Sequence, residues 1–139
     1  EISDIIDTTH FKQKSSILYV EDNPANLELM EDVIEEIETL DFYSAKTAER
    51  GVLMAQDIIP DLILMDINLP GMDGYQALSM LQENQKTQHI PVIAITANAM
   101  PRNVKKGLTA GFSSYLTKPI DLEKTIQEIQ MHIGKKYES

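Results

Sequence analysis

The chain has 139 residues, of which 12 are basic and 22 acidic, and its formal net charge is −10. This length accommodates one domain with one core, and the acidic balance argues against binding of nucleic acid or anionic membranes, which are themselves negatively charged. Cysteine is absent, which excludes disulfides and thiolate metal sites and is compatible with a cytoplasmic location. No apolar stretch approaches the length of a membrane span, so we expect no membrane contact by this segment.

The first part of the chain, residues 1–14, lacks a long periodic apolar stripe and is predicted to be a linker or an N-terminal extension. Residues 15–139 are predicted to form the domain. Because the chain begins at Glu1 rather than at a methionine, we interpret it as a fragment of a longer protein whose missing part lies upstream.

Short apolar runs mark the expected strands. Four of them occupy residues 17–20, 62–65, 92–95 and 115–117, and a weaker run covers residues 41–45. Runs that are apolar throughout are typical of parallel strands buried on both faces.

Capping residues and apolar stripes mark five helices between and after these strands. The first begins at Asn23-Pro24, the second follows Thr47 toward Asp57, the third covers residues 75–84, the fourth runs from Pro101 to Gly111, and the last follows Asp121. The strict alternation predicts an α/β fold with right-handed crossovers, of the flavodoxin-like, doubly wound kind. This fold is a three-layer sandwich around a five-stranded parallel sheet in the order 2-1-3-4-5.

Polar residues directly follow four of the apolar runs. They are Glu21, Asp22, Asp66, Thr96 and Lys118. The carboxyl ends of parallel strands share one edge of the sheet, so these side chains are expected to converge there. Each of them alone has an ordinary explanation, as a helix cap, a turn residue or a solvated side chain. Their occurrence together at one sheet edge favours a functional site.

Three carboxylates in one crevice predict a bound cation. Two like charges 4 Å apart cost about 4 kcal/mol at an effective dielectric constant of about 20, and a divalent ion removes this penalty. Ligands that are all oxygen, few in number and open to water and phosphate favour Mg²⁺. Mg²⁺ and Lys118 together would neutralise Glu21, Asp22 and Asp66. Phosphorylation of one carboxylate would then break the balance and supply oxygens that Thr96 and Lys118 can bind.

Several stretches together resemble the receiver domain of two-component response regulators. They are YVEDN at residues 19–23, MDINLPGMDG at residues 65–74, Thr96-Ala97 and Lys118-Pro119. The resemblance covers the chain from about Ser15 to Gly134. It implies that residues 15–139 are a receiver, or response regulatory, domain.

The resemblance implies a role for each residue of the acidic cluster. Asp66 would be the phosphoacceptor, which takes a phosphoryl group from the phosphohistidine of a histidine kinase or a histidine phosphotransfer domain. Glu21 and Asp22 would hold Mg²⁺ together with Asp66 and the backbone carbonyl of Asn68. Such a domain promotes its own phosphorylation and dephosphorylation, and whether it counts as an enzyme is left open.

Lys118 would pair with the phosphoryl oxygens, and the peptide before Pro119 is expected to be cis. Thr96 and Tyr115 would be the switch pair, whose movement reshapes the face formed by the fourth helix, the fifth strand and the fifth helix. A downstream effector would read this face. Homodimerisation through the last helices is left open.

The stretches EDNP at residues 21–24 and ITANAM at residues 95–100 especially resemble receivers of hybrid sensor histidine kinases. We therefore expect a carboxyl-terminal receiver of such a kinase, and a membrane anchor in that parent protein is left open. Two positions depart from the common pattern. Glu21 stands where many receivers have aspartate, and Ser113-Ser114 stands where relatives often carry acidic residues.

Four alternatives stay open at this point. A stand-alone single-domain response regulator would have the same chemistry. An aspartyl-phosphate phosphatase also uses a nucleophilic aspartate at a strand end, but Asn68 leaves it without a general acid. A flavin or nucleotide carrier would suffer repulsion between its phosphate and the carboxylates of Glu21 and Asp22. A binding module that never accepts phosphate would have no use for the complete acceptor site.

Overall fold

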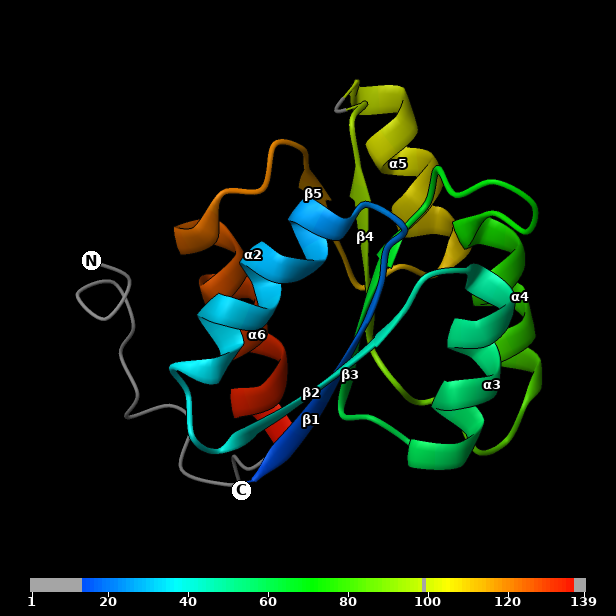
Figure 1. Ribbon diagram of the computed structural model, residues 1–139. Helices are drawn as coiled ribbons and strands as arrows, with labels where there is room; N and C mark the ends of the chain where they lie inside the picture. Colours follow the sequence, from blue (N-terminus) through cyan, green and yellow to red (C-terminus); the bar gives the residue numbers. More distant parts are fainter. Residues whose placement is uncertain (1–13, 99, 137–139) are drawn as a thin grey trace.

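The computed structural model describes residues 14–98 and 100–136, so the predicted linker lies outside the described residues except for Lys14. Five strands lie in the described part of the chain. They are β1 (Ser15–Val20), β2 (Leu40–Ala45), β3 (Leu62–Asp66), β4 (Val92–Thr96) and β5 (Ser114–Thr117). The strands are parallel and follow the order β2-β1-β3-β4-β5, which confirms the predicted topology (Figure 1).

Helices cover both faces of the sheet. They are α2 (Pro24–Glu35), α3 (Ala48–Ile58), α4 (Gly74–Glu83), α5 (Pro101–Ala110) and α6 (Leu122–Lys136). Figure 1 shows α2 and α6 on one side of the sheet and α3, α4 and α5 on the other. The predicted three-layer sandwich is thereby confirmed.

The position of β3 at the centre of the sheet explains why its sequence is apolar throughout. Leu62 and Leu64 belong to the core cluster on the side of α2 and α6, whereas Ile63 and Met65 belong to the cluster on the opposite side. All four side chains are fully buried. Each face of the sheet therefore has its own core, as expected for a parallel sheet between two helical layers.

Capping side chains begin the helices where the sequence predicts. The Asn23 side chain accepts hydrogen bonds from the backbone N–H groups of Ala25 and Asn26, and Thr47 accepts one from Arg50. Asp121 accepts one from the N–H of Lys124 at the start of α6.

Helix α4 begins at Gly74, one residue earlier than predicted, because Asp73 forms a capping box with Gln76. The Asp73 side chain accepts from the Gln76 N–H, and the Gln76 side chain accepts from the Asp73 N–H, both at 2.9 Å.

We expect Asp73→Ala to lower the free energy of unfolding by about 1 kcal/mol, because it leaves an N–H of the first turn of α4 without its side-chain acceptor. Urea denaturation measures the change. Asp73→Asn is the matched control and should keep most of the stability, since asparagine caps helices as well as aspartate does. Equal losses in the two variants would show that the cap does not stabilise α4.

Candidate metal and phosphoryl site

The three predicted carboxylates meet at the carboxyl edge of the sheet. Glu21 and Asp22 follow β1, Asp66 ends β3, and these two strands are neighbours with Val20 in register with Met65. One oxygen from each carboxylate lies within 4.8 Å of the others. Glu21 is completely buried and Asp66 is 3% exposed, whereas Asp22 is open to solvent. The predicted convergence of these residues is confirmed.

Lys118 reaches the same cluster from the end of β5. Its Nζ lies 2.8 Å from Oδ2 of Asp66 and 3.0 Å from Oε1 of Glu21. The Lys118–Pro119 peptide is cis, as the resemblance implied. One ammonium group therefore contacts both buried carboxylates at once.

Glu21 is fixed by donors on its own and neighbouring elements. Its Oε1 accepts hydrogen bonds from Asn26 Nδ2 at 2.8 Å and from the Tyr19 hydroxyl at 3.2 Å, and its Oε2 accepts one from the Asp22 N–H at 3.1 Å. Tyr19 and Asn26 are not among the site residues predicted from the sequence. The spacing of these residues in the sequence could have indicated both contacts. Tyr19 stands two residues before Glu21, so its side chain points to the same side of the strand, and Asn26 stands in the first turn of the helix that follows.

These contacts shift the pKa values of the charged groups. Burial opposes ionisation of Glu21, but hydrogen bonds with Asp66, Lys118 and Asn26 outweigh it and lower the pKa of Glu21 to about 2. Burial raises the pKa of Asp66, and the neighbouring Glu21 adds to this rise. Burial alone would lower the pKa of Lys118, whereas hydrogen bonds with Asp66 and Glu21 raise it. Lys118 is therefore held in its charged form between the two acids.

Thr96 ends β4 beside this cluster and is 1% exposed. Its hydroxyl accepts hydrogen bonds from Asn68 Nδ2 at 3.0 Å and from the Asn98 N–H at 3.2 Å. The N–H of Asn68 also donates to Oδ1 of Asp66 at 2.9 Å. Asn68 thus connects Asp66 to Thr96. The contact between the Asn68 and Thr96 side chains was not predicted from the sequence.

Tyr115, the other member of the predicted switch pair, lies on β5 next to β4, in register with Ala94. Its side chain is half-buried and packs against the core cluster on the side of α3, α4 and α5. The structure thus places Tyr115 beside the strand that carries Thr96, with its ring under α5 rather than in the acidic cluster.

The donor set fits a hard divalent cation. Carboxylate oxygens from Glu21, Asp22 and Asp66 are close enough to share one ion, and ligands that are all oxygen are those that Mg²⁺ prefers. Asp22 keeps one side of the cluster open to solvent, as an ion that retains water ligands requires.

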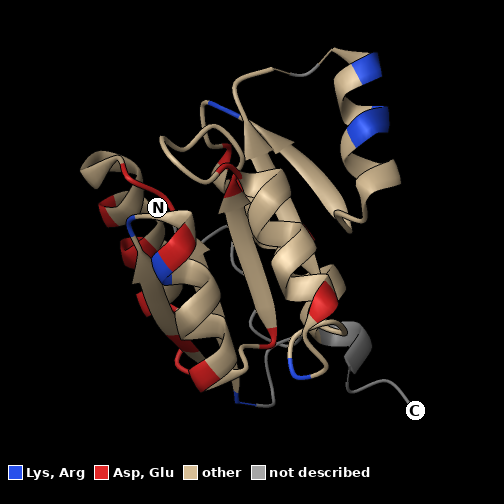
Figure 2. Ribbon diagram, turned by 90° about the vertical axis from the view of Figure 1, so that its right-hand side faces the viewer, with Lys and Arg blue, Asp and Glu red and all other residues tan. Residues whose placement is uncertain are grey.

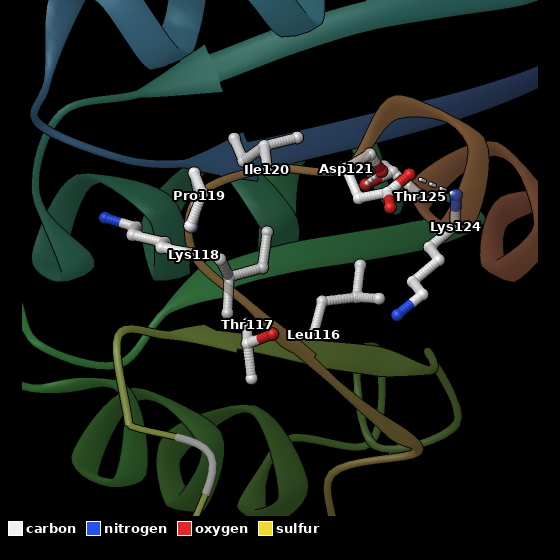
Figure 3. A pocket seen from close by; sticks show the side chains of 9 residues that line it. Leu116, Thr117, Lys118, Pro119, Ile120, Asp121, Lys124 and Thr125 are labelled. Atoms are coloured by element: carbon white, nitrogen blue, oxygen red, sulfur yellow. Dashed lines mark hydrogen bonds between the residues drawn. The ribbon is translucent and has the colours of Figure 1, made fainter.

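A cavity of about 160 Å³ borders Lys118 between the ends of β4 and β5 and the start of α6. Figure 3 shows Lys118 and Lys124 on opposite sides of Leu116, with the Lys118 ammonium directed away from the other two side chains. The acidic cluster therefore lies beside this cavity, with Lys118 at the boundary between them.

No helix in the described part of the chain is long and apolar enough to span a membrane.

Comparisons with known proteins agree with this geometry. Residues 17–130 match the response regulator receiver domain family. Over 121 residues the chain is 40% identical to the signal transduction histidine-protein kinase BarA of Escherichia coli strain K12, covering 84% of this chain and 13% of BarA. It is 37% identical over 121 residues to the polar-differentiation response regulator DivK of Brucella ovis, covering 86% of this chain and 96% of DivK.

Among solved structures, the chain is similar to the receiver domain of the sensor histidine kinase PA1611 from Pseudomonas aeruginosa PAO1. The identity is 32% and the TM-score is 0.79, over 87% of this chain and 98% of that one. The structure of the PA1611 receiver has a magnesium ion coordinated in its active-site cleft. The sheet order, the acidic cluster and the family match agree. The chain belongs to the receiver domain family of two-component response regulators.

Proposed function

We propose that this receiver domain accepts a phosphoryl group from a phosphohistidine onto Asp66 in the presence of Mg²⁺. The observation that carries the proposal is the position of Asp66 at the sheet edge, 2.8 Å from the ammonium of Lys118 and within reach of the same cation as Glu21 and Asp22. The donor would be a histidine kinase or a histidine phosphotransfer domain, the partners with which receiver domains interact.

The transfer is an in-line displacement at phosphorus. A lone pair of an Asp66 carboxylate oxygen forms the new P–O bond while the P–N bond of the phosphohistidine breaks. The electron pair of that bond returns to the imidazole, which leaves as a neutral ring because its other nitrogen carries the proton. The product is an acyl phosphate on Asp66. Lys118, now shared between Glu21 and Asp66, would turn to the new phosphoryl oxygens.

Glu21, Asp22, Asp66 and the backbone carbonyl of Asn68 would hold Mg²⁺ in this scheme. The ion would offset the negative charge on the phosphoryl oxygens during transfer. Support comes from the convergence of the three carboxylates and from the magnesium-bound structure of the PA1611 receiver. Glu21 would be oriented for this role by Tyr19 and Asn26.

Phosphorylation would act as a switch through Thr96 and Tyr115. The Thr96 hydroxyl, which accepts a hydrogen bond from Asn68, would leave it to bind a phosphoryl oxygen. Tyr115 would then move and alter the face formed by α5, β5 and α6. Helix α5 carries three basic residues and no acidic one, in contrast to the acidic elements elsewhere (Figure 2). We infer that a downstream effector binds this face.

The similarity to a segment of BarA supports a receiver within a hybrid sensor histidine kinase, with residues 15–139 as the receiver domain and residues 1–14 as its tether. The second candidate is a stand-alone response regulator, which the match to nearly all of DivK favours. A phosphatase is less well supported because Asn68 offers an amide, bound to Thr96, where an acid would be needed.

The test is incubation of the chain with Mg²⁺ and acetyl phosphate, or with a phosphorylated histidine phosphotransfer domain, followed by intact mass spectrometry. We expect a phosphoryl adduct that hydroxylamine removes, as it does acyl phosphates, and that EDTA prevents from forming. An adduct stable to hydroxylamine, or none with either donor, would contradict the proposed function.

A further inference from the structure

The two oxygens of the Glu21 carboxylate are bound unequally. Three donors meet at Oε1, namely the Tyr19 hydroxyl at 3.2 Å, Asn26 Nδ2 at 2.8 Å and Lys118 Nζ at 3.0 Å. The other oxygen, Oε2, accepts a hydrogen bond from the Asp22 N–H at 3.1 Å. A carboxylate oxygen has two lone pairs, so Oε1 is fully occupied whereas Oε2 keeps a lone pair. Oε2 is therefore the oxygen that Glu21 can offer to a cation.

Two of these donors are held in place by the fold rather than by the acidic cluster. Tyr19 is fully buried in β1, and its ring belongs to the core cluster on the side of α2 and α6. Asn26 stands in the first turn of α2, where its own N–H donates to the capping side chain of Asn23 at 3.3 Å. Neither donor can follow a carboxylate that moves, so the place at which Oε1 is bound is set by the core and by the start of α2.

The length of the glutamate side chain matches these donors. An aspartate at position 21 would carry its carboxylate one methylene group, about 1.5 Å, closer to the backbone. Bonds of the O–H···O type span about 2.5 to 3.0 Å, so the bond from Tyr19, at 3.2 Å, has no length to spare. A carboxylate drawn back by this amount would lose Tyr19 and weaken its contact with Asn26. The glutamate at position 21, where many receivers have aspartate, is thus matched to these two residues.

We propose that Tyr19 and Asn26 are positioning residues that engage Oε1 of Glu21 and leave Oε2 for the cation, and that they make glutamate the residue this site requires. The inference rests on the proposed function, in which Glu21 helps to hold Mg²⁺. Loss of a hydrogen-bond partner of a metal ligand typically lowers metal affinity about 10- to 100-fold. Aspartate at position 21, although common in receivers, therefore binds the cation more weakly in this chain than glutamate does.

The test is an NMR titration of the metal-free, ¹⁵N-labelled chain with Mg²⁺, in the absence of any phosphoryl donor. Tyr19→Phe keeps the buried ring and removes only the hydroxyl, and we expect it to lower the Mg²⁺ affinity about tenfold. Glu21→Asp should lower the affinity by a similar factor. Tyr43→Phe removes the same group from the edge strand β2, where the side chain is exposed. This variant is the matched control and should bind Mg²⁺ as wild type does.

Combining Tyr19→Phe with Glu21→Asp separates positioning from a general effect on the fold. Because Glu21→Asp already loses the tyrosine contact, the double variant should bind Mg²⁺ about tenfold more weakly than wild type, as each single variant does. Independent effects would instead multiply to about a hundredfold. Asn26→Ala, at a half-buried position on α2, should also lower the affinity, and it carries the test if Tyr19→Phe does not fold.

Wild-type Mg²⁺ affinity in Tyr19→Phe or in Glu21→Asp, or a hundredfold loss in the double variant, would overturn the inference. The titration requires no phosphorylation, so it is readable whether or not the chain accepts phosphate. A chain that shows the expected pattern of affinities but takes up no phosphoryl group would refute the proposed function and leave the role of Tyr19 and Asn26 intact. A wild-type chain without measurable affinity for Mg²⁺ would refute both.

Discussion

Asp66→Asn is expected to abolish the hydroxylamine-labile adduct. The amide has almost the shape of the carboxylate, but it lacks the negative charge and the nucleophilic oxygen that form the new bond to phosphorus. The fold should survive, because Lys118 keeps its contact with Glu21 at 3.0 Å and the crowding of two buried acids is relieved. Intact mass spectrometry after incubation with Mg²⁺ and acetyl phosphate measures the loss.

Asp73→Asn is the matched control for this prediction, since it makes the same chemical change at the cap of α4, outside the acidic cluster. It should be labelled like wild type. Labelling of Asp66→Asn at the wild-type level would show that another residue accepts the phosphoryl group.

The second large effect is expected for Lys118→Ala. This variant leaves Glu21 and Asp66, whose side chains are 0% and 4% exposed, without their shared counter-ion. Removing one partner of a buried ion pair costs about 3 kcal/mol, so we expect a loss of this order in the free energy of unfolding when EDTA is present. Saturating Mg²⁺ should restore much of it, because the cation neutralises the same carboxylates. Urea denaturation with EDTA and with Mg²⁺ measures both values.

The same variant separates binding of metal from binding of phosphate. Lys118→Ala should retain Mg²⁺ affinity, since the ammonium competes with the cation for the two acids, while phosphorylation and switching weaken. Lys124→Ala, at an exposed position on α6 beside the cavity, serves as the control and should change stability by less than about 0.5 kcal/mol. A loss of Mg²⁺ affinity in Lys118→Ala comparable to that in Asp66→Asn would refute the role given to Lys118.

The sequence was sufficient for the topology because its signals are local. Apolar runs define strands that are buried on both faces, and caps such as Asn23, Thr47 and Asp121 define where helices begin. Once the strand order is known, the ends of β1, β3, β4 and β5 must share one edge. The convergence of Glu21, Asp22 and Asp66 could therefore be predicted before any coordinates were available.

Other features could not be predicted because they depend on the relative placement of separate elements. The bond from Asn68 to Thr96 joins residues 28 positions apart, and no local pattern assigns a partner to an asparagine in a loop. The sequence offers no reason for a glycine at position 107, inside α5, whereas the structure shows that a Cβ atom there would lie 2.5 Å from the ring of Tyr115 on β5. The start of α4 depended on a reciprocal cap between Asp73 and Gln76 rather than on the apolar stripe.

The most direct test of the account locates the phosphoryl group. The chain is phosphorylated with Mg²⁺ and a phosphohistidine donor, reduced with borohydride, which converts an aspartyl phosphate to homoserine, and sequenced by tandem mass spectrometry. We predict homoserine at position 66 and unmodified aspartate at positions 22 and 73. Homoserine at another position, or its absence from a chain that received the phosphoryl group, would contradict the assignment of Asp66 as the acceptor.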